Sequence, residues 1–444
     1  MPILSRAFLS ARHALALLSV LPALAATSTI PTYNRDVAPI LQNNCEGCHR
    51  AGEAAPMSLT SYKEVRPFAA AIKEAVTLRK MPPWFADPHY GKFSNDRSLS
   101  QHDIDTLVAW AKNGAPEGDA QDLPKPKEFV EGWNIGKPDL ILEMPAAFTV
   151  PAAGTVEYQY ILIPGHFEKD TWVQMAEVRP DSRAVVHHII AFVREPGSKW
   201  LASIKPGVPY VPTKDESDMG GAQFLVGFAP GAIPAVLPDG RAKLIPAGSD
   251  IIFQVHYTTS GKPALDKSKI GLMLAKAPVT ERVMTLAATN DDFAIPPGNA
   301  NYQVESEFEF GTEAKIVDLF PHMHLRGKDF QFTAVYPTGE TQELLSVPNY
   351  SFSWQLDYHP VADIPAPKGT KLKCVAHFDN SANNPYNPDP SKEVKWGDQS
   401  WDEMMIGFFD VAFPKDMDVS KLFVEKKKDE PAATAAMPAP KTSR

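Results

Sequence analysis

The sequence predicts a multidomain fold in which a small all-α domain is followed by two all-β sandwich domains. Its 444 residues are enough for about three domains of roughly 150 residues each. Proline accounts for 42 of these residues, about double its usual share of about 5%. Because proline is poorly tolerated in helix interiors and central strands, this share disfavours a large helical bundle or a parallel α/β sheet. Many short strands joined by proline-bearing turns fit the composition better.

The overall composition is that of a globular protein. Charged residues make up 22% of the chain and hydrophobic residues 44%. Lys and Arg number 44 against 53 Asp and Glu, which gives a formal net charge of −9. No strong positive field is expected, and nucleic acid is therefore excluded as a predicted partner.

Residues 1–25 have the pattern of a secretory signal peptide. Arg6 and Arg12 supply positive charge, residues 14–24 are mostly apolar, and Ala23-Leu24-Ala25 fits a cleavage site. The apolar stretch is too short for a bilayer, which takes about 20 residues. We expect a periplasmic or secreted protein with no membrane span; an ordinary N-terminal helix is the alternative interpretation of this segment.

Residues 27–118 are expected to form the all-α domain. Helical composition or periodicity occurs at 36–41, 69–80 and 100–112, and Ser100 can cap the last of these helices. The segment 119–137 is rich in Pro, Lys and Glu, which is typical of a semi-rigid linker.

A haem attachment motif lies inside the helical region. Cys45-Glu46-Gly47-Cys48-His49 is the pattern to which c-type haem is bound. Cys45 and Cys48 would form the thioethers and His49 would be the proximal iron ligand. Helices that flank such a loop are typical of small c-type cytochromes, so one covalent haem c is predicted.

Met81 is the first candidate for the sixth ligand of that haem iron. It follows a helical segment, and the next two prolines would fix the backbone so that the thioether points inward. A core-filling role is the alternative for Met81. The other candidates for this ligand position are Met57, His89 and His102.

The third cysteine, Cys374, has no partner left for a disulfide. A buried free thiol is expected there, with a reactive thiol as the alternative.

The β region extends from residue 138 to about 424. Strand-like runs occur at 158–163, 184–192, 250–257, 303–310, 314–320 and 372–378, separated by turn residues. A break near 289–298 predicts two sandwiches, at 138–290 and 291–424. Residues 425–444 are rich in Lys, Ala, Pro and Thr, and a disordered tail is expected there.

Histidines in the β region have spacings that bear on metal binding. His187 and His188 are neighbours on a predicted strand, so they can bind one metal only if a twist or bulge turns both to one side. His256 is a lone strand histidine. His322 and His324 are at positions i and i+2, which share a strand face. Taken singly, Met404 would be a core residue.

Taken together, these residues resemble the ascorbate-dependent type II copper monooxygenases. Peptidylglycine α-hydroxylating monooxygenase and dopamine β-monooxygenase are familiar members. The resemblance covers about residues 138–415, and over the whole mature chain the sequence is similar to bacterial fusions of such a module with an N-terminal cytochrome c. It rests on the order of His187-His188, His256, His322-x-His324 with Leu325-x-Gly327, and Asp402-Glu403-Met404.

The resemblance implies two jelly-roll sandwiches that each hold one copper. Imidazole suits both copper oxidation states, and a thioether favours Cu(I). The implied ligands are His187, His188 and His256 for an electron-transfer copper, and His322, His324 and Met404 for the catalytic copper.

The implied reaction is hydroxylation of a C–H bond of a small organic substrate by O2. One oxygen atom enters the product and the other leaves as water, which requires two electrons. No catalytic side chain beyond the metal ligands is assigned. The tethered haem is expected to relay electrons to the coppers at high effective concentration, from an ascorbate-like reductant or a periplasmic redox protein.

Two departures from the family bear on the substrate. Peptide-amidating members have an Arg two residues before the HxH pair and a Tyr four residues after the methionine. Phe320 and Phe408 stand at these positions here. A peptide C-terminus is therefore disfavoured as the substrate, and an apolar or aromatic compound fits better.

Two other function classes remain open on the sequence. One is a non-enzymatic electron-transfer or copper-binding protein. The other is a structural or ligand-binding sandwich whose histidines hold zinc or no metal. A methionine ligand argues against zinc, which prefers nitrogen, oxygen and thiolate donors.

Overall fold

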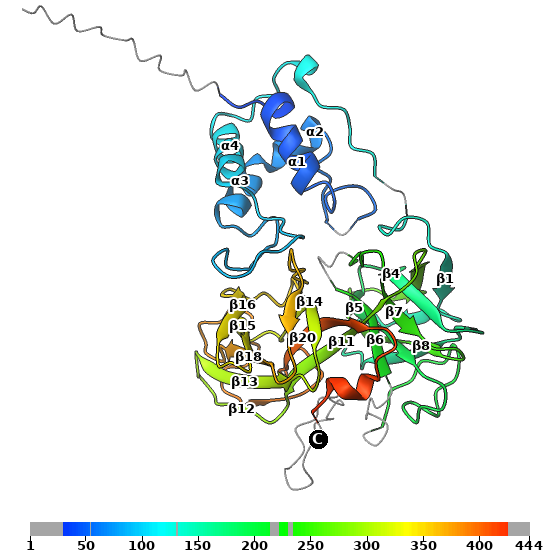
Figure 1. Ribbon diagram of the computed structural model, residues 1–444. Coiled ribbons are helices and arrows are strands. Elements are labelled where there is room, and N and C mark those ends of the chain that lie inside the picture. Colours follow the sequence, from blue (N-terminus) through cyan, green and yellow to red (C-terminus); the bar gives the residue numbers. More distant parts are fainter. Residues whose placement is uncertain (1–29, 54, 130–131, 214–221, 230–233, 425–444) are drawn as a thin grey trace, which may run out of the picture.

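The computed structural model describes residues 30–53, 55–129, 132–213, 222–229 and 234–424 (Figure 1). The predicted signal peptide (1–25) and the predicted tail (425–444) lie outside these residues. Strands predominate in the described part of the chain, and they are arranged in the layers of β-sandwiches. The predicted β character after residue 138 is confirmed. A search of the described residues finds no helix with the length and hydropathy needed to cross a membrane.

Apart from the short helix η5 (Val419–Leu422) near the C-terminal end, the helices gather at one end of the molecule, at the top of Figure 1. Val37, Val65, Leu107 and Trp110 are completely buried among them, so this region has a core of its own. The elements are η1 (Tyr33–Val37), α1 (Ala38–Asn44), α2 (Tyr62–Val65), η2 (Arg66–Phe68), α3 (Ala69–Thr77), α4 (Gln101–Lys112) and η3 (Ala120–Asp122).

Helix α4 begins as the sequence predicts. The Ser100 hydroxyl accepts a hydrogen bond from the backbone N–H of Asp103 at 3.1 Å, which satisfies one of the free donors of the first turn. Ile104, Leu107 and Trp110 are the buried residues of this helix, and they recur at the helical period.

Two four-stranded sheets each form one layer of a sandwich. Their strand orders are β3-β8-β5-β6 and β13-β18-β15-β16. The strands are β3 (Gln159–Ile163), β5 (Val186–Arg194), β6 (Ala222–Phe228), β8 (Asp250–Tyr257), β13 (Tyr302–Glu309), β15 (Gly327–Val335), β16 (Thr341–Val347) and β18 (Lys371–Phe378). Each run that the sequence predicted as a strand corresponds to one of these or to β14 (Ala314–His322).

The other layer of both sandwiches is a single eight-stranded sheet, in the order β1-β10-β4-β7-β11-β20-β14-β17. The remaining strands pair as β2 with β9 and β12 with β19. The bounds are β1 (Leu140–Glu143), β4 (Thr171–Arg179), β7 (Arg241–Ile245), β10 (Lys269–Leu274), β11 (Glu281–Asn290), β17 (Ile364–Ala366), β20 (Met405–Pro414), β2 (Phe148–Val150), β9 (Ala264–Asp266), β12 (Ala294–Ile295) and β19 (Val394–Lys395).

Each sandwich has its own hydrophobic core. The first core lies between Met144 and Leu272 in the sequence, and the second between Leu286 and Leu422. The boundary between the two cores therefore lies before the predicted break at 289–298. The reason is that β11 pairs along its whole length with β20 of the second sandwich.

Strand β18 shows how the sequence builds the second core. Its burial alternates strictly, with Leu372, Cys374, Ala376 and Phe378 completely buried. Cys374 is a free, buried cysteine, as predicted. A Cβ atom on Gly407 would lie 2.4 Å from the Cys374 Sγ, so only glycine allows this approach.

The helical region contacts both sandwiches. On the second sandwich, the backbone N–H groups of Asp87 and Ser94 donate to the carbonyl oxygens of Ser346 and His359, each at 2.8 Å. On the first sandwich, the Glu53 carboxylate lies 3.5 Å from the Arg183 guanidinium. The region that contains the haem motif is thus placed over both β domains.

Candidate metal centres and the cavity between them

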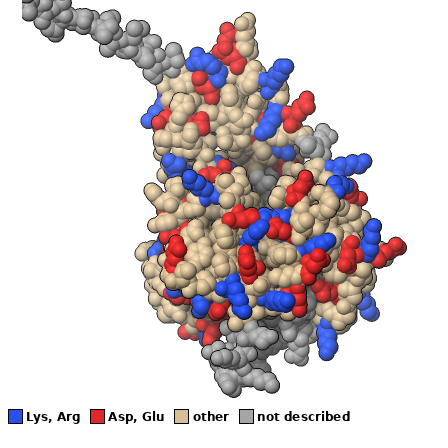
Figure 2. All heavy atoms as spheres, in the orientation of Figure 1, with Lys and Arg blue, Asp and Glu red and all other residues tan. Residues whose placement is uncertain are grey.

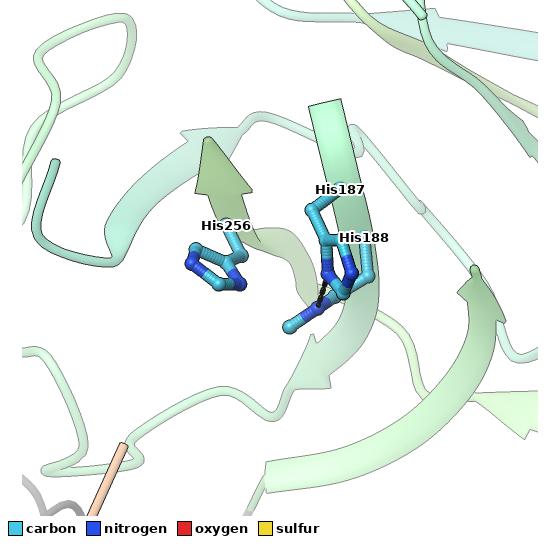
Figure 3. Close-up of side chains that lie close together, drawn as sticks. All are labelled: His187, His188 and His256. Carbon is cyan, nitrogen blue, oxygen red and sulfur yellow. Dashed lines mark hydrogen bonds between the residues drawn. The ribbon is translucent and has the colours of Figure 1, made fainter. Parts of the chain in front are cut away.

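Three histidines converge on the neighbouring strands β5 and β8 (Figure 3). The ligand atoms of His187, His188 and His256 all lie within 4.8 Å of one another. A regular strand would point His187 and His188 to opposite faces. The pairing of β5 with β8 shifts between Val186 and His188, so the strand carries the bulge that joint binding requires.

The environment of this cluster favours neutral imidazoles. Burial lowers the pKa of His187. Burial, followed by the neighbouring histidines, holds the pKa of His188 well below its usual value. Burial and then His187 lower the pKa of His256 to about 3. Neutral imidazole is the form that binds metal ions.

One ring atom of the cluster points to a missing ligand. The Nδ1 atom of His256 is buried and has no hydrogen-bond partner among the described residues. The Nδ1 atoms of His187 and His188 lie 3.2 Å apart, and the figure draws this contact (Figure 3). Buried polar atoms without partners are rare in folded proteins, and a coordinated ion would satisfy this one. The three imidazoles therefore fit a metal ion, and copper is one of the metals that imidazole suits.

The second histidine pair lies at the end of β14. The ring centroids of His322 and His324 are 5.3 Å apart. The spacing predicts both residues on one strand, and this is wrong for His324, which follows the last residue of β14. Burial lowers the pKa of His322 to about 4 and holds that of His324 well below its usual value.

The turn that follows, from His324 to Gly327, is held by the buried carboxyl group of Glu403, next to Met404. Glu403 is completely buried, and its two oxygens accept hydrogen bonds from the backbone N–H groups of His324 (2.9 Å) and Arg326 (2.6 Å). The residue after Glu403 is Met404, and two residues later Ile406 pairs with His322 across β14 and β20. The backbone of Met404 is thereby brought to the histidine pair.

A segment that the sequence analysis left unassigned connects the two histidine groups. The Phe352 ring stacks on His187 with centroids 5.0 Å apart and meets His324 edge-on at 5.9 Å. Three residues on, the Gln355 side-chain oxygen lies 2.6 Å from the His322 Nδ1. That contact sets the ring so that Nε2 remains for a metal. No spacing or composition signal in the sequence marks either residue.

A cavity of about 160 Å³ lies between the two sandwiches. Its wall is mostly apolar, and it contains His188 from the first histidine group and His322 from the second. Met404 also lines it. Besides these three side chains, the wall includes the aromatic residues Tyr158, Phe224, Phe320, Trp396 and Phe408.

The predicted haem motif follows helix α1, and its histidine ring contacts the backbone. The Nδ1 of His49 lies 3.2 Å from the Met57 carbonyl oxygen, which leaves Nε2 for iron. Cys45 and Cys48 are free and partly buried beside it. Two free thiols and an imidazole with a free Nε2 are compatible with a covalent haem, which stays a prediction.

The candidates for the sixth haem ligand differ in exposure. Met81 and Met57 are partly buried, and Met57 packs against the helical core. His102 is exposed on α4. His89 is exposed and lies 2.6 Å from an Asp87 carboxylate oxygen. Exposure disfavours both histidines as ligands, and Met81 remains the predicted one.

Charges of both signs are interspersed over the face shown in Figure 2.

Comparisons with known proteins do not identify a family for this chain. No protein-family model matches the chain, and no curated protein matches it.

Among solved structures, one of the infectious bursal disease virus Gx strain is 12% identical over 64% of this chain and 74% of its own, with a TM-score of 0.18. One of PNGF-II is 10% identical over 62% of this chain and 65% of its own, with a TM-score of 0.28. Similarities of this size support no conclusion about fold or function.

Proposed function

We propose that this chain is an exported copper-dependent monooxygenase that hydroxylates a C–H bond of a small organic substrate with O2. The observation that carries the proposal is the convergence of two histidine groups and Met404 at one cavity. His187, His188 and His256 would hold one copper, and His322, His324 and Met404 the second. In its finer detail the fold would be two jelly-roll domains, at 138–290 and 291–424.

Bound copper would supply one-electron redox chemistry and a site for O2. The protein's own residues prepare the site for it. Burial keeps all five histidines neutral and available as ligands. Gln355 orients His322, and Glu403 orients His324 through the backbone. The apolar cavity wall keeps water away from the reacting C–H bond.

The helical region would supply the electrons. We assign it as a c-type cytochrome domain at 27–118, with a haem bound by Cys45, Cys48 and His49 and by Met81 as the sixth ligand. Glu53 follows the haem motif and contacts Arg183, four residues before His187. This contact supports an electron path from the motif to the first histidine group, and the ultimate donor would be an ascorbate-like reductant or a periplasmic redox protein.

Metal analysis and isotope labelling test the proposal. The purified full chain is expected to contain one haem and two coppers. Candidate apolar substrates, reductant and ¹⁸O2 are expected to give a product with one labelled oxygen atom. Copper without oxygen consumption would instead support an electron carrier, and a chain that takes up no copper would overturn the proposal.

Matched histidine variants sharpen that test. His256→Asn and His322→Asn are each expected to lower the copper content from two to one per chain and to abolish product formation. His166→Asn is the control, because His166 is exposed and its φ of 49° is one that Asn also adopts. Two coppers in either test variant would contradict the ligand assignment.

A further inference from the structure

The floor of the cavity is a ladder of paired side chains. β14 and β20 are antiparallel neighbours, and alternate residues of each line the cavity. In register, His322 pairs with Ile406, Phe320 with Phe408, and Asp318 with Asp410. The floor therefore has a histidine end, an aromatic middle and a carboxylate end.

The strand β14 fixes the distance between the carboxylate end and the histidine end of the floor. Asp318 lies four residues before His322 on the same strand, which separates their Cα atoms by about 13 Å at a rise of about 3.3 Å per residue. Between them, the rings of Phe320 and Phe408 stack with centroids 5.6 Å apart. A molecule that reaches both ends must therefore be elongated, and its middle must be apolar.

The carboxylate end is polar, and its charges are already paired. The Lys243 ammonium lies 3.1 Å from an Asp410 carboxylate oxygen. The His359 ring lies 3.1 Å from an Asp318 carboxylate oxygen. Although burial opposes it, the hydrogen bond to Asp318 raises the pKa of His359 to about 9, and burial raises the pKa of Asp318.

A third carboxyl group, that of Asp357, also lines the cavity at this end. Burial and then the Asp318 charge raise its pKa to about 7. Asp410 acts in the same direction, and the cations His359 and Lys243 oppose it. From the helical region, Arg97 also interacts with Asp357. The end thus offers carboxyl oxygens as hydrogen-bond acceptors with little excess charge.

We propose that the cavity binds an elongated, mostly apolar molecule with one uncharged hydrogen-bond-donating head, such as a long-chain alcohol. The head lies at the Asp318, Asp357 and Asp410 carboxyl groups, and the tail lies over the stacked rings of Phe320 and Phe408 and extends toward His322. A charged head would compete with the pairs that Lys243 and His359 already form. This inference rests on the proposed function only for what happens at the His322 end.

Binding to the metal-free full chain tests the inference without any turnover. Hexanol, octanol, decanol and dodecanol form a length series, with octane, octylammonium and octanoate as matched probes of the head. Trp396 lines the cavity and reports binding by fluorescence. Affinity for the alcohols is expected to rise with chain length until the alkyl chain extends from the carboxylate end to the histidine end of the floor. It should then level off.

The head group of the probe is expected to affect its affinity as strongly as its chain length does. Octanol should bind at least tenfold more tightly than octane, octylammonium or octanoate. Tighter binding of either charged probe overturns the uncharged head, and affinity that does not depend on chain length overturns the ladder. No binding by any probe overturns the whole inference, whether or not the chain proves to be an oxygenase.

Two variants locate the molecule in the cavity. Asp357→Asn keeps the size of the side chain and is expected to reduce the preference for octanol over octane. Phe408→Trp should block the middle of the ladder, so dodecanol loses more affinity than hexanol. Asp416→Asn is the control, because it removes an exposed carboxylate just beyond β20. If Phe408→Trp fails to fold, the Asp357→Asn comparison still decides the head position.

Discussion

The indole of Trp84 faces the phenol ring of Tyr358, with ring centroids 4.9 Å apart, across the boundary between the helical region and the second sandwich. Phe93 completes the group, with its ring 5.5 Å from that of Tyr358. Aromatic contacts of this kind add to the free energy of docking beyond the area that they bury. The helical region is therefore fixed to the β domains by side-chain packing as well as by the chain itself.

Trp84→Ala is expected to loosen this docking. The contact area lost corresponds to about 2 kcal/mol. The backbone N–H groups of Asp87 and Ser94, which donate across the boundary, should then exchange with solvent about thirtyfold faster. Hydrogen exchange of the full chain measures this change.

Tyr90→Ala is the control for the docking prediction, because Tyr90 lies on the same segment and is exposed. It is expected to leave the exchange rates unchanged. Equal rates in wild type and Trp84→Ala would show that the aromatic contact does not hold the two parts together.

Phe352→Leu removes the ring that lies between His187 and His324. Copper content is expected to stay at two per chain, because neither histidine group loses a ligand. Turnover should fall by roughly tenfold, or about 1.4 kcal/mol in activation free energy. The reason is that electron transfer between the two histidine groups would lose the aromatic ring that contacts both. The measurement pairs metal analysis with the rate of oxygen consumption.

Trp354→Leu provides the comparison from the same segment. Trp354 is half-buried and packs on the second core. A similar loss of rate in both variants would assign the effect to the segment as a whole and not to the bridging ring.

Glu403→Ala should both destabilise the chain and weaken its second metal site. It leaves the backbone N–H groups of His324 and Arg326 buried without acceptors, at a cost of about 3 kcal/mol in the free energy of unfolding. Copper binding at His322 and His324 should weaken, and binding at the other group should persist. Denaturant unfolding and copper titration measure the two effects.

Glu307→Ala, on the exposed face of β13, controls for the loss of a carboxylate. Unchanged copper affinity in Glu403→Ala would show that the turn keeps its shape without this side chain.

His256 makes the stability of the metal-free protein depend on pH. Its pKa falls from about 6.5 in the unfolded chain to about 3 in the fold. Below pH 6.5 the unfolded chain takes up a proton that the folded chain does not. This histidine's share of stability is therefore lost as pH falls, by about 1.4 kcal/mol per pH unit.

His256→Asn should accordingly flatten the stability profile between pH 6 and pH 4, in denaturant unfolding of the metal-free chain. His166→Asn is expected to retain the wild-type slope. Parallel profiles for wild type and His256→Asn would mean that the ring takes up its proton in the folded state.

The strands and the α4 cap could be predicted from sequence because each follows from local periodicity. The bulge at His187 could be anticipated, since two adjacent histidines cannot otherwise share a site. The hydrogen bond that holds the backbone of His324 could not be predicted, because its acceptor, Glu403, lies some eighty residues further on. Phe352 and Gln355 belong to no pattern, and only the fold shows that they touch histidines of both groups.

The way the two sandwiches are joined has a practical consequence. Strands β7 and β11 pair in parallel through only two residue pairs, yet these pairs make one sheet of both halves. A recombinant fragment ending near residue 275 would expose the β7 edge, and the complementary fragment would expose β11. Open edges of this kind recruit other chains and aggregate. Chimeras of this protein should therefore exchange both sandwiches together.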